Sequence, residues 1–445
     1  MRAIILTCEK DDGELLALRP LCGIPLVRRH LYTLRNLGWR QALILTDPGQ
    51  RAQLEAAVGD PRKLGMHVSY LEVDGQEGLP LSELAALEED LLLIEAHYLV
   101  EGRILSTLVG LDRPALAYDS SPPWSEGLSL TVRQGQVAAV GEGAGDGLYA
   151  GTLFLPRQAL ARLAGEHLPL AELPGLQRLA AELELTAFDV GQLDPYVAEV
   201  RRQARPFWCR VASQGEAERC REALVGEAQK RTLDVVAWYI NRPLENWTTR
   251  RIADWPITPN QMSAIVSLIA FAATGLFLAG WLLPASLLTL VVNVFDGVDG
   301  KLARVKGLTT KLGHLEHSFD LLYEQSWYMA FTWATFTRRG DLLPLQLGFL
   351  ALLFDSFARH VSMQFRQVMG VSLADYAPFD RLFRRFDGRR NIYTYYMLLG
   401  IIFGRPLYAL AAIACHAILT SAVYAYRAGK YLHAADLGAN DREEL

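Results

Sequence analysis

The chain has 445 residues, which is long enough for two or three domains. Its formal net charge of -5 at pH 7 gives no support to a nucleic-acid-binding function, and we expect no nucleic-acid partner. Hydrophobic residues form 51% of the sequence, but the long apolar runs are concentrated in its last part. The chain should therefore combine a soluble domain with a membrane domain.

The cysteines show neither metal-ligand spacing nor an evident disulfide framework, which is typical of a reducing compartment; they are Cys8, Cys22, Cys209, Cys220 and Cys415. The first apolar run, Ala3–Thr7, is too short for a signal peptide and is expected to be a buried strand. Neither feature indicates secretion.

The front of the chain alternates strand-like and helix-like stretches. After the strand at Ala3–Thr7, a helix is expected over Pro25–Leu37 with a stop at Gly38, followed by a strand over Gln41–Thr46. Further strands are expected at Leu91–Ala96 and Ala115–Tyr118, with a hairpin over Leu128–Val140 that turns at Gln134-Gly135. This alternation predicts an α/β domain on a mostly parallel sheet, with boundaries at residues 1–228.

The segment Leu21–Val27, after the first strand, resembles the sugar-nucleotide nucleotidyltransferases. The resemblance implies a glycine-rich phosphate loop after strand one, but Cys8–Glu14 is acidic and contains a single glycine. It also implies two metal-binding aspartates, one near Glu95-Ala96-His97 and one around Arg210 or Ala212, and neither is present. We therefore expect a degenerate, catalytically silent domain. His97 is a substitute ligand or, as is more common for a lone histidine, structural.

The join between the two parts is basic and aromatic. A charged helix over Gly215–Lys230 should close the front domain, and residues 229–258 form an amphipathic juxtamembrane segment. Within it, Thr232–Trp255 mixes apolar and aromatic side chains with arginines, which indicates a helix lying on the inner leaflet. A linker helix packed on the front domain is the alternative.

Residues 259–432 are expected to form an all-α transmembrane domain of about six helices, followed by a polar tail at 433–445. No charged side chain occurs from Met262 to Phe295, a run long enough for two spans with a turn at Gly280 and Pro284. The other spans are expected at Leu315–Thr337, Leu342–Met363, Ile392–Gly404 and Leu407–Tyr426. The Lys and Arg residues between spans place both termini on the cytoplasmic side of the inner membrane.

Carboxylates are concentrated at the end of the second apolar run. Asp296 and Asp299 are three positions apart, and Glu316, Asp320 and Glu324 follow at a spacing that puts them on one helix face. Acids at the end of a membrane helix usually serve chemistry, and oxygen ligands without thiols suit Mg²⁺ or Mn²⁺. The alternative is acidic helix caps that pair with Lys301, Arg304 and Lys311.

These residues resemble the CDP-alcohol phosphotransferase signature, Asp-x2-Asp-Gly-x2-Ala-Arg, eight residues, Gly, three residues, Asp, three residues, Asp. The first half is matched by Asp296, Asp299, Gly300, Ala303, Arg304 and Gly313. The last two acids would fall on His317 and Leu321, whereas a shift of one residue restores a pair at Glu316 and Asp320. Pro256–Asn260 resembles the motif that opens the family's first span.

The resemblance implies transfer of a substituted phosphate group from a CDP-alcohol donor to an acceptor hydroxyl on a lipid or polyol phosphate, with release of CMP. It implies metal ligands at Asp296, Asp299, Glu316 and Asp320, with Asp320 as general base, and contacts to the CDP moiety from Gly300, Arg304 and Gly313. The active site should face the cytoplasm in contact with membrane lipid, and relatives tend to form homodimers.

The basic segment Asp380–Arg390 offers guanidinium groups for a phosphate or acceptor through Arg384, Arg385, Arg389 and Arg390, or serves only topology and anionic lipid. Asp355 and Arg359 are expected to form an ion pair. Two alternatives stay open for the whole chain. One is a bifunctional enzyme whose front domain makes the CDP-alcohol from CTP, as in the archaeal CDP-inositol-forming enzymes that the fusion resembles; the other is a dead, nucleotide-sensing membrane protein.

Overall fold

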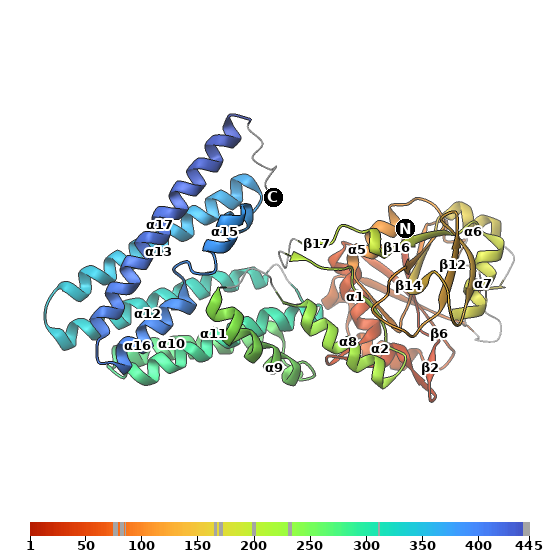
Figure 1. Ribbon diagram of the computed structural model, residues 1–445. Coiled ribbons are helices and arrows are strands. Elements are labelled where there is room, and N and C mark those ends of the chain that lie inside the picture. The colour runs from red at the N-terminus through yellow and green to blue at the C-terminus, as the bar shows by residue number, and fades with distance from the viewer. Residues whose placement is uncertain are drawn as a thin grey trace.

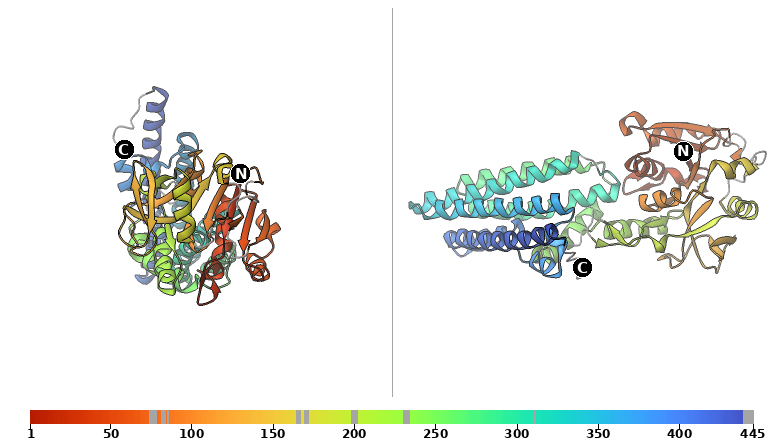
Figure 2. Two further views of the ribbon diagram at one scale, coloured as in Figure 1. Left: turned by 90° about the vertical axis from the view of Figure 1, so that its right-hand side faces the viewer. Right: turned by 90° about the horizontal axis from the view of Figure 1, so that it is seen from above.

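The computed structural model describes residues 1–438 except 74–78, 81–83, 85, 164–166, 169–171, 198–201, 230–233 and 310–311. The protein has two parts, an α/β domain at the N-terminal end and an elongated helix bundle at the C-terminal end (Figures 1 and 2). Helices α8 and α9 lie between them in Figure 1.

A nine-stranded mixed sheet forms the centre of the front domain. Its strand order is β11 (Ala115–Asp119), β16 (Thr186–Asp189), β13 (Gln136–Gly141), β12 (Ser129–Arg133), β14 (Gly147–Leu155), β9 (Leu91–Glu95), β1 (Arg2–Leu6), β6 (Gln41–Thr46) and β7 (His67–Glu72). Strands β9, β1, β6 and β7 run parallel, as expected of buried apolar runs. The predicted strands are confirmed, but β14, β12 and β13 pair antiparallel, so the sheet is less parallel than expected.

The predicted hairpin is confirmed as β12–β13, with Gln134 and Gly135 at its turn. Both turn residues have positive φ, +52° and +78°, which matches the right-handed twist of the flanking strands. The helices of this domain are α1 (Leu26–Asn36), α2 (Arg51–Val58), α3 (Pro61–Leu64), α5 (Gly102–Val109), α6 (Arg157–Leu163), α7 (Glu172–Glu182) and α8 (Gln214–Glu227).

The helical half contains the six helices expected from the apolar runs: α10 (Pro259–Leu278), α11 (Leu282–Lys306), α12 (Glu316–Arg339), α13 (Leu343–Met369), α16 (Arg390–Ile402) and α17 (Pro406–Asp436). Two short helices, α14 (Leu373–Tyr376) and α15 (Pro378–Phe383), connect α13 to α16. Within the described residues three helices, α10, α11 and α17, are long and apolar enough to cross a membrane. Charges interrupt α12 and α13, and α16 has only 13 residues.

Local sequence explains where these helices begin and end. Thr258 caps α10, since its hydroxyl accepts a hydrogen bond from Gln261 N while the Gln261 side chain accepts one from Thr258 N. Gly307, Gly340 and Gly370 end α11, α12 and α13 in the left-handed conformation that glycine adopts most easily.

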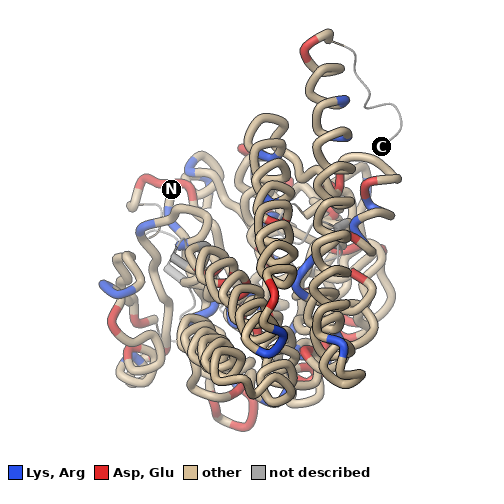
Figure 3. The backbone as a smooth tube through the Cα atoms, turned by 90° about the vertical axis from the view of Figure 1, so that its left-hand side faces the viewer, with Lys and Arg blue, Asp and Glu red and all other residues tan. Residues whose placement is uncertain are grey.

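Large apolar side chains face outward along the bundle, which suits a lipid environment. Charged residues are sparse along the helices seen from their far end (Figure 3). More than half of the surface of several apolar side chains is exposed; examples are Leu268, Leu278, Met329, Phe349 and Leu353. A soluble protein rarely exposes so much continuous apolar surface.

Buried ion pairs hold the middle of the bundle together. Arg359 on α13 donates to Asp355 at 2.8 Å and pairs with Glu324 on α12 at 2.5 Å, which confirms the predicted Asp355–Arg359 pair. Glu324 is 2% exposed and also accepts a hydrogen bond from Tyr328. Glu324 therefore faces α13, and the expectation that it shares one face with Glu316 and Asp320 is wrong. The 3.6-residue helical period turns a residue eight positions on away from the first.

The juxtamembrane segment contains a π-helical turn over Ala237–Asn241 and helix α9 (Arg242–Ile252). Its aromatic side chains point outward, with Tyr239 and Trp247 72% and 61% exposed. Arg242 lies over the Trp238 ring at 4.2 Å. This exposure favours an interfacial helix over a linker helix packed on the front domain.

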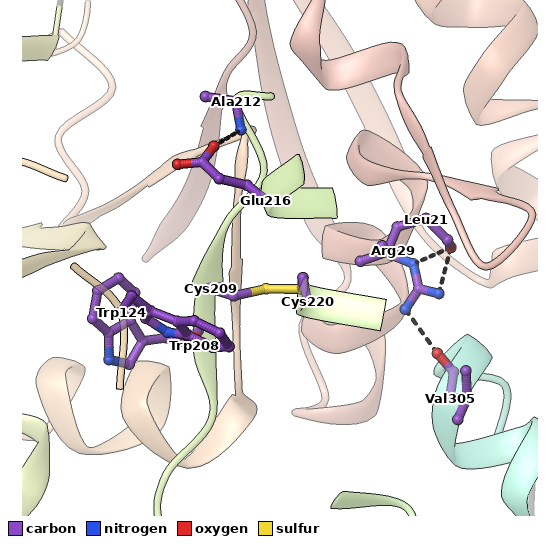
Figure 4. The surroundings of a disulfide bond; sticks show 9 residues. All are labelled: Leu21, Arg29, Trp124, Trp208, Cys209, Ala212, Glu216, Cys220 and Val305. Atoms are coloured by element: carbon purple, nitrogen blue, oxygen red, sulfur yellow. Dashed lines mark hydrogen bonds between the residues drawn. A yellow bond between two sulfur atoms is a disulfide. The ribbon is translucent and has the colours of Figure 1, made fainter. Parts of the chain in front are cut away.

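The junction between the two halves is a continuous apolar cluster that includes Leu26, Val225 and Val305. Cys209 and Cys220 are joined there in a disulfide that connects β19 (Trp208–Arg210) to α8 (Figure 4). The expectation that the cysteines show no disulfide framework is therefore wrong for this pair. The two residues are 11 positions apart, and only the return of α8 onto β19 brings them together.

Candidate functional site

A cavity of about 320 Å³ lies at the end of the helix bundle that faces the front domain. Side chains of α9, α10, α11, α12 and α16 line it, and they include Asp296, Asp299, Gly300, Arg304, Gly313, Glu316, Asp320 and Arg390. The structure thus brings together both halves of the sequence motif and one arginine of the basic segment.

Helix α11 supplies two carboxylates to this cavity because Asp296 and Asp299 are three positions apart on one face. The glycines beside them make room for neighbours. A Cβ on Gly297 would lie 2.4 Å from the carboxyl carbon of Glu245, so a larger residue here would displace the Glu245 carboxylate from its present position. A Cβ on Gly300 would lie 3.5 Å from the Arg304 guanidinium.

Asp296 is held by an arginine and a tyrosine. Arg390, the first residue of α16, forms an ion pair with Asp296 Oδ2, and the Tyr323 hydroxyl lies 2.9 Å from Asp296 Oδ1. Tyr323 OH also lies 3.2 Å from Asp320 Oδ1 and accepts from Arg390 at 2.5 Å. The two carboxylates of the motif that lie on different helices are therefore linked through one buried phenol.

Asp299 and Glu316 both form a hydrogen bond with the hydroxyl of Ser263. Ser263 Oγ lies 2.7 Å from Asp299 Oδ2 and 3.3 Å from Glu316 Oε2. Asp299 Oδ1 accepts a hydrogen bond from Gly300 N at 2.5 Å. Asp299 is only 1% exposed, so it would be costly to bury without such partners.

The structure places both candidates for the third acid position near Asp320. Within the described residues, ligand atoms of Glu316, His317 and Asp320 lie within 4.8 Å of one another. His317 Nδ1 is 3.4 Å from Asp320 Oδ2, and the His317 side chain is 66% exposed. Glu316 and His317 are adjacent at the first turn of α12, so both can reach one ion.

The charge balance of the cavity fits a divalent cation. Among its described lining residues are five carboxylates but three Lys or Arg side chains, an excess of two negative charges. The buried pair of Lys301 and Glu245, 2.8 Å apart, accounts for one charge of each sign, and Arg390 offsets Asp296. Carboxylate oxygens are the donors that Mg²⁺ and Mn²⁺ prefer, so these residues fit the ion that the sequence implies.

The four arginines of the basic segment lie in different surroundings. Arg384 and Arg389 pair with buried Asp387 at 3.1 Å and 2.8 Å, and Arg385 is exposed. Of these four arginines only Arg390 lines the cavity. Arg304 also lines it, and its Nε donates to the carbonyl of Ala228 at 2.7 Å.

Three residues at the site were missed at the sequence level: Glu245, which lines the cavity, and Ser263 and Tyr323, which contact its carboxylates. Ser263 is one turn after Pro259, which starts α10, so its position near the site could have been inferred from the helix start. Glu245 is about 50 residues upstream of the motif, and the sequence gives no signal for it.

In the front domain the residues of the loop at Cys8–Glu14 contact one another and Asp47. It forms a short hairpin, β2 (Lys10–Asp11) and β3 (Glu14–Leu15), and Lys10 pairs with Asp47 at 2.6 Å. Burial and the neighbouring Asp47 carboxylate raise the pKa of the Cys8 thiol to about 12, so it stays protonated and is a poor nucleophile.

Near the expected metal positions, Glu95 and His97 are buried, and the carbonyl of His97 accepts from Val211 N at 2.7 Å. Asp119, at the end of β11, is a buried acid that the sequence prediction did not single out. It accepts from the Trp208 indole at 2.9 Å and pairs with Arg205. A carboxylate engaged in this way has a structural explanation.

Comparison with known proteins agrees with the bundle geometry. Residues 256–375 match the family model of CDP-alcohol phosphatidyltransferase, so the C-terminal half contains such a domain. The chain is 36% identical over 74 residues to inner membrane protein YnjF of Escherichia coli (strain K12). That match covers 16% of this chain and 36% of YnjF, just over a third of its length.

Among solved structures, the inositol-1-phosphate CTP transferase from T. maritima is similar with 14% identity and a TM-score of 0.38, over 48% of this chain and 90% of that chain. A UDP-glucose pyrophosphorylase complexed with UDP-glucose has 12% identity and a TM-score of 0.38, over 51% and 98% of the two chains.

We expect Mn²⁺ to bind in the cavity, and its affinity to fall at least about tenfold in Asp299→Asn, since removing even an outer partner of a metal ligand costs about 10–100-fold. Electron paramagnetic resonance of free Mn²⁺ in a titration of purified protein measures this. Asp341→Asn, an exposed change at the opposite end of α12, is the matched control. Equal affinities in the two variants would contradict the assignment.

Proposed function

Because the C-terminal half contains a CDP-alcohol phosphatidyltransferase domain, we propose that the protein is a membrane transferase that uses a CDP-alcohol as donor. An acceptor hydroxyl oxygen attacks the phosphorus that carries the alcohol. The bond between this phosphorus and the CMP oxygen breaks, so CMP leaves and a phosphodiester remains. The observation that carries the proposal is the convergence of Asp296, Asp299, Glu316 and Asp320 on one cavity.

In this reaction Asp299 and Glu316, with Asp296, would hold Mg²⁺ or Mn²⁺. The ion would supply positive charge to the pyrophosphate when bound. Ser263 keeps the carboxylates of α11 and α12 in register, since its hydroxyl contacts both. Arg390 and Tyr323 fix the orientation of Asp296.

Asp320 is the proposed general base. Its side chain is 20% exposed in the cavity, so one face is open to a hydroxyl. Its other contacts, Tyr323 at 3.2 Å and His317 at 3.4 Å, hold the carboxylate without neutralising it by a Lys or Arg. A carboxylate in this position can take the acceptor's proton as the new bond forms.

Gly300 and Gly313 line the cavity, and residues without a Cβ would let nucleotide phosphates approach the backbone. Arg304 is the proposed phosphate contact, with its Nε anchored on Ala228. The cavity lies between the membrane helices and the front domain, so a lipid and a water-soluble substrate can both reach it. We propose inner-membrane location with both termini and this cavity cytoplasmic.

The function is tested by CMP release from a donor panel. Purified full-length protein with Mg²⁺ or Mn²⁺ is given CDP-diacylglycerol or water-soluble CDP-alcohols, with lipid or polyol-phosphate acceptors. We expect metal-dependent CMP formation from at least one donor, and none with EDTA. No CMP from any donor would favour a dead, nucleotide-sensing protein.

Asp320→Asn should lower turnover by about 10²–10⁴-fold, because general-base catalysis contributes that much. Glu324→Gln should leave measurable activity, since Glu324 faces Arg359 rather than the cavity. CMP formation and membrane insertion are measured for both variants. Near wild-type activity in Asp320→Asn with a dead His317→Ala would mean that the unshifted alignment is the better guide.

The front domain should be catalytically silent, because its loop cation Lys10 is paired with Asp47 and the expected aspartates are absent. The measurement is pyrophosphate release by the full chain from CTP with inositol, glycerol or sugar phosphates. We expect only background. Release above background would support the bifunctional alternative, in which this domain makes the CDP-alcohol.

A further inference from the structure

A second cavity, of about 550 Å³, lies at the junction of the two halves. Its described lining includes residues of α1, β10 (Tyr98–Val100), the start of α5, residues 204–207, the end of α8, and the end of α11 with the segment that follows it. Arg304 and Thr309 line this junction cavity and the carboxylate cavity as well. The two cavities are therefore neighbours that share a wall.

The junction cavity has the opposite charge to its neighbour. Its described lining includes four arginines, Arg29, Arg103, Arg205 and Arg304, but only two carboxylates, Glu101 and Glu227. Arg205 is paired with Asp119, which lies outside the lining, so the excess is one positive charge, where the carboxylate cavity has an excess of two negative charges. A cleft lined by one sign of charge raises the local concentration of ligands of the other sign.

Arg29 is the most deeply placed of these cations, with 4% of its surface exposed. Its guanidinium donates to the carbonyl of Leu21 at 2.9 and 2.6 Å and to the carbonyl of Val305 at 2.9 Å (Figure 4). Within the described parts of the chain, no carboxylate forms an ion pair with Arg29 within 4.0 Å, and Asp254 acts on it from a greater distance. A buried charge without a direct ion pair is costly, so an anion in the cavity would stabilise it.

The rest of the lining is largely apolar, with Leu37, Leu99, Phe207 and Leu224 among its side chains. Small-molecule sites typically combine such an apolar wall with a few polar groups, in volumes of about 300–1,000 Å³. Inorganic phosphate alone would leave this wall without contacts. The lining fits a phosphate ester with a ring or a carbon skeleton.

We propose that the junction cavity binds a water-soluble organic phosphomonoester beside the carboxylate cavity. Two sources share this chemistry, a nucleoside monophosphate such as released CMP and a phosphorylated polyol. The site is distinct from the metal-binding carboxylates, and its occupation does not depend on the transfer reaction.

Isothermal titration of detergent-purified full-length protein with CMP, glycerol 3-phosphate and inositol 1-phosphate tests the proposal. EDTA is present, and each titration is repeated in Asp299→Asn, so that neither a metal nor an active transferase is required. We expect one ester to bind with a stoichiometry of one in both proteins. Tighter CMP binding identifies a nucleotide site, and tighter binding of a polyol phosphate identifies an acceptor-type site.

Two matched variants locate the binding. Ser106→Asp puts a negative charge on an exposed position of the lining, and should weaken binding by roughly fivefold or more through like-charge repulsion. Thr107→Asp is the next residue on α5, outside the described lining, and should leave the affinity unchanged. Absence of binding by all three esters, or equal affinities in the two variants, overturns the proposal.

Discussion

Buried carboxylates at the end of the helix bundle that faces the front domain need partners for their negative charge. The rest of this structure depends on that constraint. Asp296 and Asp299 are fixed by the α11 sequence, and burying them requires partners from other helices. α10 supplies Ser263, α12 supplies Tyr323 and α16 supplies Arg390. The positions of three helices are thus tied to the same pair of acids.

The front domain joins this arrangement at the end of α11. Arg29 reaches the carbonyl of Val305, and Arg304 reaches the carbonyl of Ala228, so each half donates to the backbone of the other. Gly23 also lies against Asp254, where a Cβ would come within 2.9 Å of the carbonyl oxygen. The α/β domain can thereby serve as a fixed wall beside the carboxylate cavity.

Much of this could be predicted because the signals were local. The apolar runs gave six helices, and the spacing of Asp296, Asp299, Gly313 and Asp320 placed them on one site. Residues whose role depends on tertiary packing could not be found in this way. Glu245 enters the site because its carboxylate occupies the space beside Gly297, and the Cys209–Cys220 bond exists only because α8 returns to β19.

Extrapolation of a local pattern failed at Glu324. The spacing of four residues held from Glu316 to Asp320, but over one more turn the helix rotated the next acid toward Arg359. The arginines of the basic segment have different partners, which depend on tertiary packing. Asp387 is buried and takes up Arg384 and Arg389, which leaves Arg390 for Asp296.

The central claim is that the carboxylate cavity of the helical half, and not the front domain, performs the chemistry. It is tested most directly by the initial rate of CMP formation in three full-length proteins with Mn²⁺: wild type, Asp299→Asn in the cavity and Lys10→Ala in the front-domain loop. The account predicts loss of CMP formation in Asp299→Asn and a wild-type rate in Lys10→Ala. A wild-type rate in Asp299→Asn, or its loss in Lys10→Ala, would contradict it.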